Sequence, residues 1–408
     1  VVVIGKDTRV SGDMLESALT AGILAVGGNV IRAGDIPTPA IAYLAKYYKA
    51  DAGIVISASH NTFEYNGIKF FNGEGYKLDD DIEEEIEDII ISSIDVNSHI
   101  TGELIGRCLD ASEDAAELYA AHLLETVDFR LDGIKVALDC ANGASYRIAP
   151  KVYEALGAEV IVTGNEPNGI NINDGCGSTH PEKLSGLVQK TGAHVGLAFD
   201  GDADRLIVVD EKGNVIDGDR VIAICARMLK EQGRLAENKA TVTVMSNIGF
   251  HKAMEESGID VDVTGVGDRY VLEQMLKSGC VIGGEQSGHI IFREYTTTGD
   301  GILSSLQFME AVLASGRKIS EMASEIQIFP QVLVNARVKN ENKKKYSNDP
   351  QIAAAIEEIE KKMEGNGRVL IRPSGTEPLV RVMIEGDDEV VLDQMARGLA
   401  DLIEEKFM

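Results

Sequence analysis

One stretch of this chain indicates both its fold and its chemistry: Val195-Gly196-Leu197-Ala198-Phe199-Asp200-Gly201-Asp202-Ala203-Asp204-Arg205. Its first five residues form a short apolar run, which predicts a buried strand. Three carboxylates follow at alternate positions, and the small residues between them let the backbone curl so that the acids face one point. Adjacent carboxylates repel one another unless a cation neutralises them. The predicted metal ligands are therefore Asp200, Asp202 and Asp204.

Mg²⁺ is the expected ion, because proteins usually hold it with a few carboxylates together with phosphate oxygens of the substrate. The alternative is a solvated acidic turn, which is common in acidic proteins. That alternative does not explain why the acids stand at the tip of an apolar strand.

Composition limits the class of protein. A length of 408 residues suggests two to four domains, and a net charge of −27 argues against nucleic acid or an anionic membrane as the main partner. The five cysteines are scattered without a CxxC pair, so neither a disulfide framework nor a zinc site is indicated, and a reducing cytoplasm is expected. The sequence shows no secretory signal and no apolar run long enough to span a membrane.

One strand–helix pattern occurs three times, which predicts three successive related βαβ domains over residues 1–108, 109–212 and 213–327. In each repeat the third strand runs into a polar loop: 53–56 into 57–61, 195–199 into 200–205, and 280–282 into 283–289. Ligands bind at the carboxyl ends of parallel strands. The three loops are therefore expected at equivalent places. The remaining residues, 328–408, read as strand–helix–strand–strand–helix, a small α+β domain.

Ser59 lies where the third strand of the first repeat enters its loop, so it is a candidate nucleophile or phosphate carrier; a capping serine is the structural alternative. Lys69 lies within loop reach downstream and would neutralise a phosphoryl group or assist proton transfer, unless it is an ordinary surface lysine. Glu285, Ser287 and His289 alternate, so in an extended loop they would share one face and suit sugar hydroxyls. A hydrogen-bonded structural loop is the alternative.

The stretch Arg372-Pro373-Ser374-Gly375-Thr376 reads as a phosphate cradle. The arginine offers a bidentate fork, the hydroxyls donate, and the glycine lets backbone N–H groups approach. Arg381, on the following strand, adds positive charge. A tight turn between two strands is the alternative, and the stretch lacks the lysine and the length of a nucleotide-binding P-loop.

Together these loops resemble those of the α-D-phosphohexomutase family, in order and over essentially the whole chain. The matching stretches are the phosphoserine loop Ile56–Asn61, the metal loop Asp200–Arg205, the sugar loop Gly284–His289 and the phosphate loop Arg372–Pro378. The resemblance implies a four-domain cleft architecture, with three mixed-sheet domains and a C-terminal TBP-like domain. Family members open with a strand and helix carrying a Gly-Thr-Asp-Gly-Val-Arg-Gly type stretch, and we expect that segment to be missing from the first domain here.

The resemblance is greatest to the members that act on glucosamine phosphate, through Gln286 and the stretch 266–271. It implies transfer of phosphate between O6 and O1 of glucosamine phosphate through glucosamine 1,6-bisphosphate. Ser59, carried as phosphoserine, would donate the phosphoryl group and join the three aspartates around Mg²⁺. The implied roles of the other site residues are acid/base chemistry for Lys69 and His289, positive charge from Arg9 and Arg205, sugar binding by Glu285 and Ser287, and phosphate binding by Arg372, Ser374, Gly375, Thr376 and Arg381.

The implied partners are a hexosamine phosphate substrate, a second copy in a homodimer and, as for some family members, a diadenylate cyclase. Three alternatives remain open from the sequence. The chain would act on glucose or mannose phosphate, would bind without turnover, or would be a phosphatase of the haloacid dehalogenase type with Asp200 as nucleophile.

Overall fold

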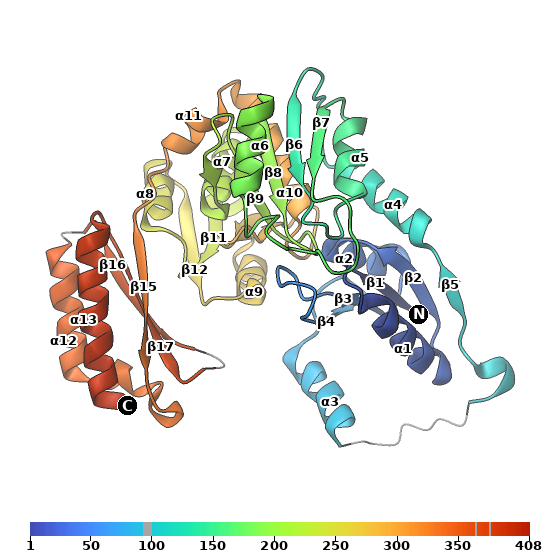
Figure 1. Ribbon diagram of the computed structural model, residues 1–408, viewed down its shortest axis with the longest axis horizontal. Helices are drawn as coiled ribbons and strands as arrows, with labels where there is room; N and C mark the ends of the chain where they lie inside the picture. Colours follow the sequence, from blue (N-terminus) through green and yellow to red (C-terminus); the bar gives the residue numbers. More distant parts are fainter. Residues whose placement is uncertain (93–99, 364, 375–376) are drawn as a thin grey trace. The chain divides into compact units, whose positions relative to one another are not determined.

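The computed structural model of the protein describes residues 1–92, 100–363, 365–374 and 377–408 (Figure 1). The chain forms two compact units. The first contains Val1–Thr243 and Ile259–Ser324, and the second contains Val244–Gly258 and Glu325–Met408. Within the described residues no helix is long and apolar enough to cross a membrane, and the five cysteines are free thiols.

The first repeat forms a five-stranded sheet in the order β4-β3-β1-β2-β5. The central β1 pairs in parallel with both β2 and β3, whereas β4 runs antiparallel to β3. Its elements are β1 (Val2–Lys6), α1 (Gly12–Ala25), β2 (Val30–Asp35), α2 (Thr38–Tyr47), β3 (Ala52–Ile56), β4 (Ile68–Asn72), α3 (Asp80–Ile91) and β5 (Cys108–Asp110).

The second repeat forms a sheet in the order β10-β9-β8-β6-β7, with β6 in parallel pairing to β7 and β8 and with β9 antiparallel to β8. All five residues of β8 are buried, as its apolar sequence predicts. The elements are α4 (Ser112–Glu125), β6 (Lys135–Asp139), α5 (Ile148–Ala155), β7 (Glu159–Thr163), α6 (Glu182–Thr191), β8 (Val195–Phe199), β9 (Leu206–Val209) and β10 (Val215–Ile216).

The third repeat forms a sheet in the order β12-β11-β13-β14. Here too the first strand, β11, pairs in parallel with the other two, and β14 runs antiparallel to β13. Its elements are α7 (Gly218–Glu231), β11 (Lys239–Thr243), β12 (Asp260–Thr264), α9 (Asp268–Ser278), β13 (Ile282–Gly284), β14 (Ile290–Phe292), α10 (Gly301–Ser315) and α11 (Ile319–Ser324). The helix between β11 and β12, α8 (Ile248–Glu256), belongs to the second unit.

The three sheets share one topology. In each, a central first strand lies between the second and third strands, and an antiparallel strand flanks the third. The connections β3–β4, β8–β9 and β13–β14 therefore occupy equivalent positions, and these are the three loops that the sequence marks as chemical. The repeat predicted from the sequence is present, and the flanking antiparallel strand makes each sheet mixed.

The C-terminal part of the second unit has an antiparallel sheet in the order β15-β17-β16. Apolar residues of α12 and α13 pack on the sheet in one core cluster that includes Ile352, Val382 and Ile403. The elements are β15 (Gln331–Arg337), α12 (Pro350–Lys362), β16 (Arg368–Pro373), β17 (Leu379–Glu385) and α13 (Glu389–Phe407). Their order confirms the predicted strand–helix–strand–strand–helix pattern.

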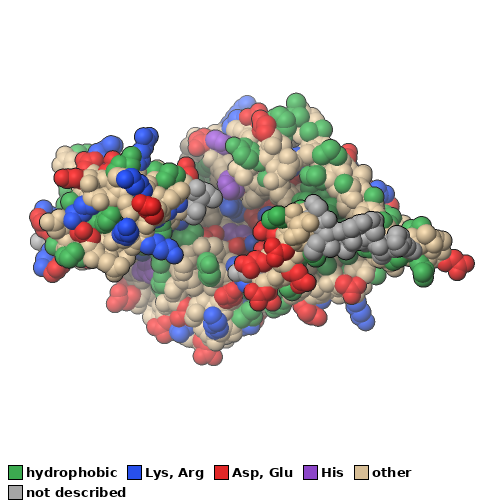
Figure 2. Space-filling view, turned by 90° about the horizontal axis from the view of Figure 1, so that it is seen from below, with side chains coloured by type: hydrophobic (Ala, Val, Ile, Leu, Met, Phe, Trp, Pro, Cys, Tyr) green, Lys and Arg blue, Asp and Glu red, His purple; other side chains and the backbone are tan. Residues whose placement is uncertain are grey.

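Acidic side chains are widespread on the face drawn in Figure 2. The helix α3 alone exposes Asp81, Glu83, Glu84, Glu85, Glu87 and Asp88. Such a surface repels polyanions.

One local expectation was wrong. Residues 285–289 form a tight hairpin turn rather than an extended loop, because the Glu285 N–H donates to the His289 carbonyl oxygen across it. Lys69 lies on β4, downstream of the Ser59 loop. Ser11 is the N-cap residue of α1, and its hydroxyl bonds Asn66 rather than the helix backbone.

Candidate active site

The metal loop follows β8 and is buried. Asp200 and Asp202 are fully buried and Asp204 is 7% exposed, and one oxygen from each lies within 4.8 Å of the others. Ala203 takes a left-handed conformation (φ 57°), which curls the chain and brings the alternate carboxylates to one side. A side chain at Gly201 would lie 2.6 Å from the Ser59 carbonyl oxygen, so only glycine permits this approach of the two loops.

Two carboxylate oxygens in this loop have no hydrogen-bond partner among the described residues. They are Oδ1 of Asp202 and Oδ1 of Asp204, and both are buried. Buried polar atoms are nearly always paired, with protein or with an ion. Three converging carboxylates with two such oxygens fit a divalent metal ion, for which oxygen ligands are preferred.

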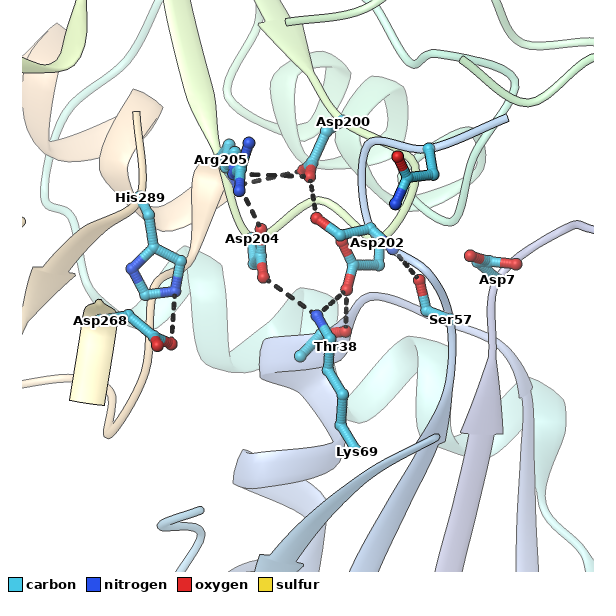
Figure 3. Close-up of polar contacts among 12 residues, drawn as sticks. Asp7, Thr38, Ser57, Lys69, Asp200, Asp202, Asp204, Arg205, Asp268 and His289 are labelled. Carbon is cyan, nitrogen blue, oxygen red and sulfur yellow. Dashed lines mark hydrogen bonds and ion pairs between the residues drawn. The ribbon is translucent and has the colours of Figure 1, made fainter. Parts of the chain in front are cut away.

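Lys69 lies against these carboxylates (Figure 3). Its Nζ is 2.6 Å from Oδ2 of Asp202 and 3.3 Å from Oδ2 of Asp204. Burial lowers the pKa of Lys69, but the two aspartates outweigh that effect and raise it above its usual value. Lys69 is therefore a cation held at the metal loop.

The carboxylates respond differently to this environment. Burial, then Asp204 and Asp202, raise the pKa of Asp200 well above the usual value. Burial also acts to raise the pKa of Asp202, but Lys69 and the Thr38 hydroxyl outweigh it and hold that pKa below its usual range. Burial and the neighbouring carboxylates thus oppose ionisation of Asp200, and positive charge beside it would favour its ionised form.

Ser59 is fixed at three points. Its residue is left-handed (φ 51°), and its N–H donates to Oγ of Ser57 at 2.9 Å. Its hydroxyl donates to Oδ2 of Asp200 at 2.8 Å, and its carbonyl oxygen accepts from Nδ2 of Asn173 at 2.9 Å. A non-glycine residue in this conformation is strained, and strain of this kind collects at functional sites.

Arg9 is buried and supports the loop rather than contacting Ser59. Its Nε lies 2.8 Å from an oxygen of Asp7, and its guanidinium donates to the carbonyl oxygens of Asn61, Thr62 and Tyr65. Burial raises the pKa of Asp7, although Arg9 opposes the shift. The role of Arg9 visible in the structure is to hold the chain that follows Ser59.

Arg205 ends the metal loop and is 22% exposed. Its Nε lies 4.0 Å from Oδ2 of Asp200 and 3.9 Å from Oδ1 of Asp204, beyond hydrogen-bond distance. Burial lowers the pKa of Arg205, but Asp200 and Asp204 outweigh it and raise the pKa. The guanidinium places positive charge beside the triad.

The hairpin of residues 285–289 adjoins the metal loop. Arg205 and His289 form an antiparallel backbone bridge, and the N–H of Leu206 donates to the Gly288 carbonyl oxygen at 2.9 Å. Oε1 of Glu285 accepts from the N–H of Gly267 at 3.2 Å, and Ser287 is exposed at the turn. The structure therefore brings the metal loop and the sugar loop together.

His289 is 4% exposed, and its Nε2 lies 3.4 Å from Oδ2 of Asp268 (Figure 3). Lys77 pairs with the same oxygen. Burial acts to raise the pKa of Asp268, but His289 and Lys77 outweigh it and hold that pKa well below its usual range. Asp268 lies in the stretch 266–271, but no sequence signal pointed to its contact with His289, because only folding places the start of α9 beside this hairpin.

Thr38 and Asn173 were also missed. The Thr38 hydroxyl donates to Oδ2 of Asp202 at 2.5 Å, and Asn173 donates to the carbonyl oxygens of both Ser59 and Asn61 at 2.9 Å. The hydrogen bonds of Thr38 to Asp202 and of Asn173 to Ser59 each join residues that are more than 100 positions apart in the sequence. The Thr-Pro pair at 38–39 is typical of a helix start, so the local pattern does not point to the site.

The predicted phosphate cradle lies in the second unit. Arg372 on β16 stands opposite Arg381 on β17 in the sheet register. Oγ of Ser374 accepts from the N–H of Glu377 at 3.2 Å, and the Ser374 carbonyl oxygen accepts from Nζ of Lys343 at 3.0 Å. The other two predicted residues, Gly375 and Thr376, lie outside the described residues. Two arginines on neighbouring strands offer the charge that a phosphate group requires.

Comparison with known proteins agrees with this fold. Models of the phosphoglucomutase/phosphomannomutase family match four successive parts of the chain. The three α/β/α domains match residues 1–95, 117–213 and 217–329, and the C-terminal domain matches 333–402.

Relatives cover nearly the whole chain. A phosphoglucosamine mutase of Clostridium novyi is 55% identical over 405 residues, which are 99% of this chain and 90% of the relative. A phosphoglucosamine mutase of a Thermoanaerobacter species is 58% identical over the same shares. Among solved structures, a phosphoglucomutase/phosphomannomutase family protein of Burkholderia thailandensis superposes with a TM-score of 0.81 at 24% identity, covering 100% of this chain and 90% of that one. An N-acetylphosphoglucosamine mutase of Aspergillus fumigatus, solved with GlcNAc-6P and magnesium, gives a TM-score of 0.68 at 18% identity over 92% and 93% of the chains.

The fold and the buried carboxylate site define an enzyme of the phosphohexomutase class. The chain belongs to the phosphoglucomutase/phosphomannomutase family. The family and the buried triad together indicate a divalent metal ion. The alternative of a haloacid dehalogenase phosphatase is not supported, because the four matched domains of another family cover most of the chain.

Proposed function

We propose that this protein interconverts glucosamine 6-phosphate and glucosamine 1-phosphate, with Ser59 as the phosphate carrier. The observation that carries the proposal is the hydrogen bond from the Ser59 hydroxyl to Oδ2 of Asp200, inside a buried carboxylate triad. The choice of glucosamine is supported by relatives named phosphoglucosamine mutase at 55–58% identity. In this role the protein would supply glucosamine 1-phosphate for UDP-N-acetylglucosamine synthesis.

The reaction exchanges two phosphoryl groups without loss of phosphate. Ser59, carried as phosphoserine, gives its phosphoryl group to the free O1 or O6 of the sugar phosphate. The P–O bond to Ser59 breaks as the P–O bond to the sugar forms, and the sugar hydroxyl passes its proton to the acid/base group, for which Lys69 and His289 are the candidates. The product is glucosamine 1,6-bisphosphate. After the sugar reverses in the site, the second phosphoryl group returns to the Ser59 oxygen and the released sugar oxygen takes up a proton.

Mg²⁺ is the proposed ion, bound by Asp200, Asp202, Asp204 and an oxygen on Ser59. When bound it would stabilise the charge that develops on the transferred phosphoryl group. The two unpaired oxygens of the triad support this ligand set.

The chain's own residues supply the rest. Lys69 is a cation at the metal loop, so we assign it to stabilising the phosphoryl oxygens. It also remains one of two candidates for the acid/base group. His289, buried beside Asp268, is the other candidate. Glu285 and Ser287 would hold sugar hydroxyls from the adjoining hairpin, and Arg205 and Arg9 would contribute charge and support.

The phosphate that does not react would bind the C-terminal loop. We assign it to Arg372, Ser374, Gly375, Thr376 and Arg381. The two arginines that face each other across β16 and β17 support this assignment. The division of the chain at 1–108, 109–212, 213–327 and 328–408 is likewise proposed, and the four matched domain ranges support it.

Phosphorus NMR tests the proposal. The purified chain is mixed with Mg²⁺, glucosamine 6-phosphate and a trace of the sugar bisphosphate. A signal at the anomeric phosphate is expected. Ser59→Ala should reduce turnover by roughly 1,000-fold or more, because it removes the proposed phosphate carrier. Ser17→Ala, an exposed serine on α1, serves as the matched control and should leave the rate unchanged.

Other outcomes separate the alternatives. If the chain converts glucose or mannose phosphate but not glucosamine phosphate, the family assignment stands and glucosamine phosphate is rejected as the substrate. No conversion of any of the three would indicate a chain that binds without turnover. Substantial activity in Ser59→Ala would reject the phosphoserine.

The proposed setting is the cytoplasm, with a homodimer as the oligomer. The homodimer follows from the family resemblance and is tested by light scattering after gel filtration, where a monomer mass would reject it. Binding to a diadenylate cyclase is a further proposal from the same resemblance. Pull-down with the purified cyclase tests it, and no retention would reject it.

A further inference from the structure

Thr38 is the first residue of α2 and lies against the metal loop. It is 1% exposed, and Asp202 is fully buried. Pro37 precedes it in an extended conformation (ψ 147°), and the α2 backbone turns into the helix at Thr38. Thr38 and Asp202 are 164 residues apart in the sequence, so their contact depends on the fold.

Two hydrogen bonds join these residues. The N–H of Thr38 donates to the carbonyl oxygen of Asp202 at 2.9 Å, and the Thr38 hydroxyl donates to Oδ2 of the same aspartate at 2.5 Å (Figure 3). One bond fixes the backbone of Asp202 and the other fixes its carboxylate. The positive end of the α2 dipole also faces this aspartate, which favours its charged form.

The two oxygens of the Asp202 carboxylate have separate environments. Oδ2 accepts from both Thr38 and Lys69, at 2.5 and 2.6 Å. Oδ1 is buried and has no partner among the described residues. A carboxylate with one oxygen tied by two donors presents the other to a cation in a defined orientation.

We propose that Thr38 is a positioning residue for the metal ion: by holding Oδ2 and the backbone of Asp202, it orients Oδ1 as a single ligand. Groups that hydrogen-bond to metal ligands typically contribute 10- to 100-fold to metal affinity. The threonine also ties the first domain to a loop of the second. The affinity of the metal loop therefore depends on a residue outside it.

The test measures metal affinity directly. The chain is stripped of metal with EDTA and titrated with Mn²⁺, and the free ion is followed by electron paramagnetic resonance with no sugar present. Thr38→Val, which keeps the shape and removes the hydroxyl, should weaken binding about 10- to 100-fold. Thr38→Ser keeps the donor and should stay within about threefold of the parent chain.

Thr241→Val is the matched control. Thr241 is also fully buried, but its hydroxyl has no hydrogen-bond partner among the described residues. The affinity of the Thr241→Val variant for Mn²⁺ should equal that of the parent chain. If Thr38→Val does not fold, Thr38→Ala replaces it with the same expected loss.

The result that would overturn the proposal is an affinity within twofold of the parent chain for the folded variant lacking the hydroxyl. Equal losses in the valine and serine variants would also overturn it, because they would assign the effect to packing. The inference rests on the proposed function through its metal site, yet the readout needs no turnover. If the parent chain shows no mutase activity but its Mn²⁺ affinity still depends on the Thr38 hydroxyl, the proposed function is rejected and the positioning role of Thr38 stands.

Discussion

The structure predicts that the buried carboxyl group of Asp300 makes the stability of the chain depend on pH. It is 1% exposed and caps α10, where Oδ1 accepts from the N–H of Leu303 at 2.9 Å. Oδ2 accepts from the Tyr119 hydroxyl at 2.7 Å. Burial raises the pKa of Asp300 to about 6, and the hydrogen bonds only partly oppose it. The change to make is Asp300→Asn, because asparagine also serves as an N-cap.

The magnitude follows from proton linkage. A shift from 3.8 to about 6 is about 2.2 pKa units, and at about 1.4 kcal/mol per unit this amounts to about 3 kcal/mol. The folded chain holds this proton more tightly than the unfolded chain does. The resulting stability is fully present below pH 4 and is lost as the pH rises through 6. At pH 7.5 the ionised carboxylate of Asp300 therefore lowers the free energy of unfolding by about 3 kcal/mol. An asparagine carries no charge and avoids this loss.

The assay is urea unfolding followed by far-UV circular dichroism, at half-unit steps from pH 5 to pH 8 in EDTA. Asp300→Asn should be more stable than the parent chain at pH 7.5, by up to about 3 kcal/mol, and the difference should shrink steadily toward pH 5. Asp388→Asn is the control, since Asp388 also caps a helix but is exposed. A difference that does not change with pH would refute the reasoning, and so would a variant that is less stable at every pH.

Two further predictions concern the site itself. Lys69→Met should lower mutase activity by about 100-fold or more. It should still bind Mn²⁺ at least as tightly as the parent chain, because a competing cation is removed from beside the three carboxylates. Weaker Mn²⁺ binding would instead show that Lys69 holds the metal ligands in place. Asn173→Ala should lower kcat about 10-fold with little change in KM, because it frees the carbonyl oxygens of Ser59 and Asn61. An unchanged kcat for a folded Asn173→Ala would reject this role, and Asn168→Ala, an exposed asparagine of the same loop, is its control.

Much of the fold was predictable because it rests on local signals. The apolar run Val195–Phe199 forms a fully buried strand, and the threefold repeat of strands and helices corresponds to three sheets of one topology. The family resemblance implied mixed sheets, but the positions of the antiparallel strands β4 and β14 were not predicted from their own sequences. Each is short, three to five residues, and it is defined by pairing with the third strand of its repeat rather than by its own sequence.

The candidate site was predictable only in part. The Asp triplet was visible because its three ligands are adjacent in sequence, at the end of one strand. Thr38, Asn173 and Asp268 were not, because each acts on a residue more than 20 positions away. Their residue types are also common in caps and turns, so that no local pattern distinguishes them.

The sequence by itself determined which groups are present and at which strand ends they stand. Periodicity defines strands, and in parallel sheets the strand ends define where loops lie. Only the tertiary structure decided which groups meet: that the Ser59 hydroxyl bonds Asp200, that Lys69 and Thr38 share one oxygen of Asp202, and that two carboxylate oxygens remain without partners. The physical reason is that hydrogen bonding and charge act over a few ångströms in space, whereas these residues are separated by 130 positions or more along the chain.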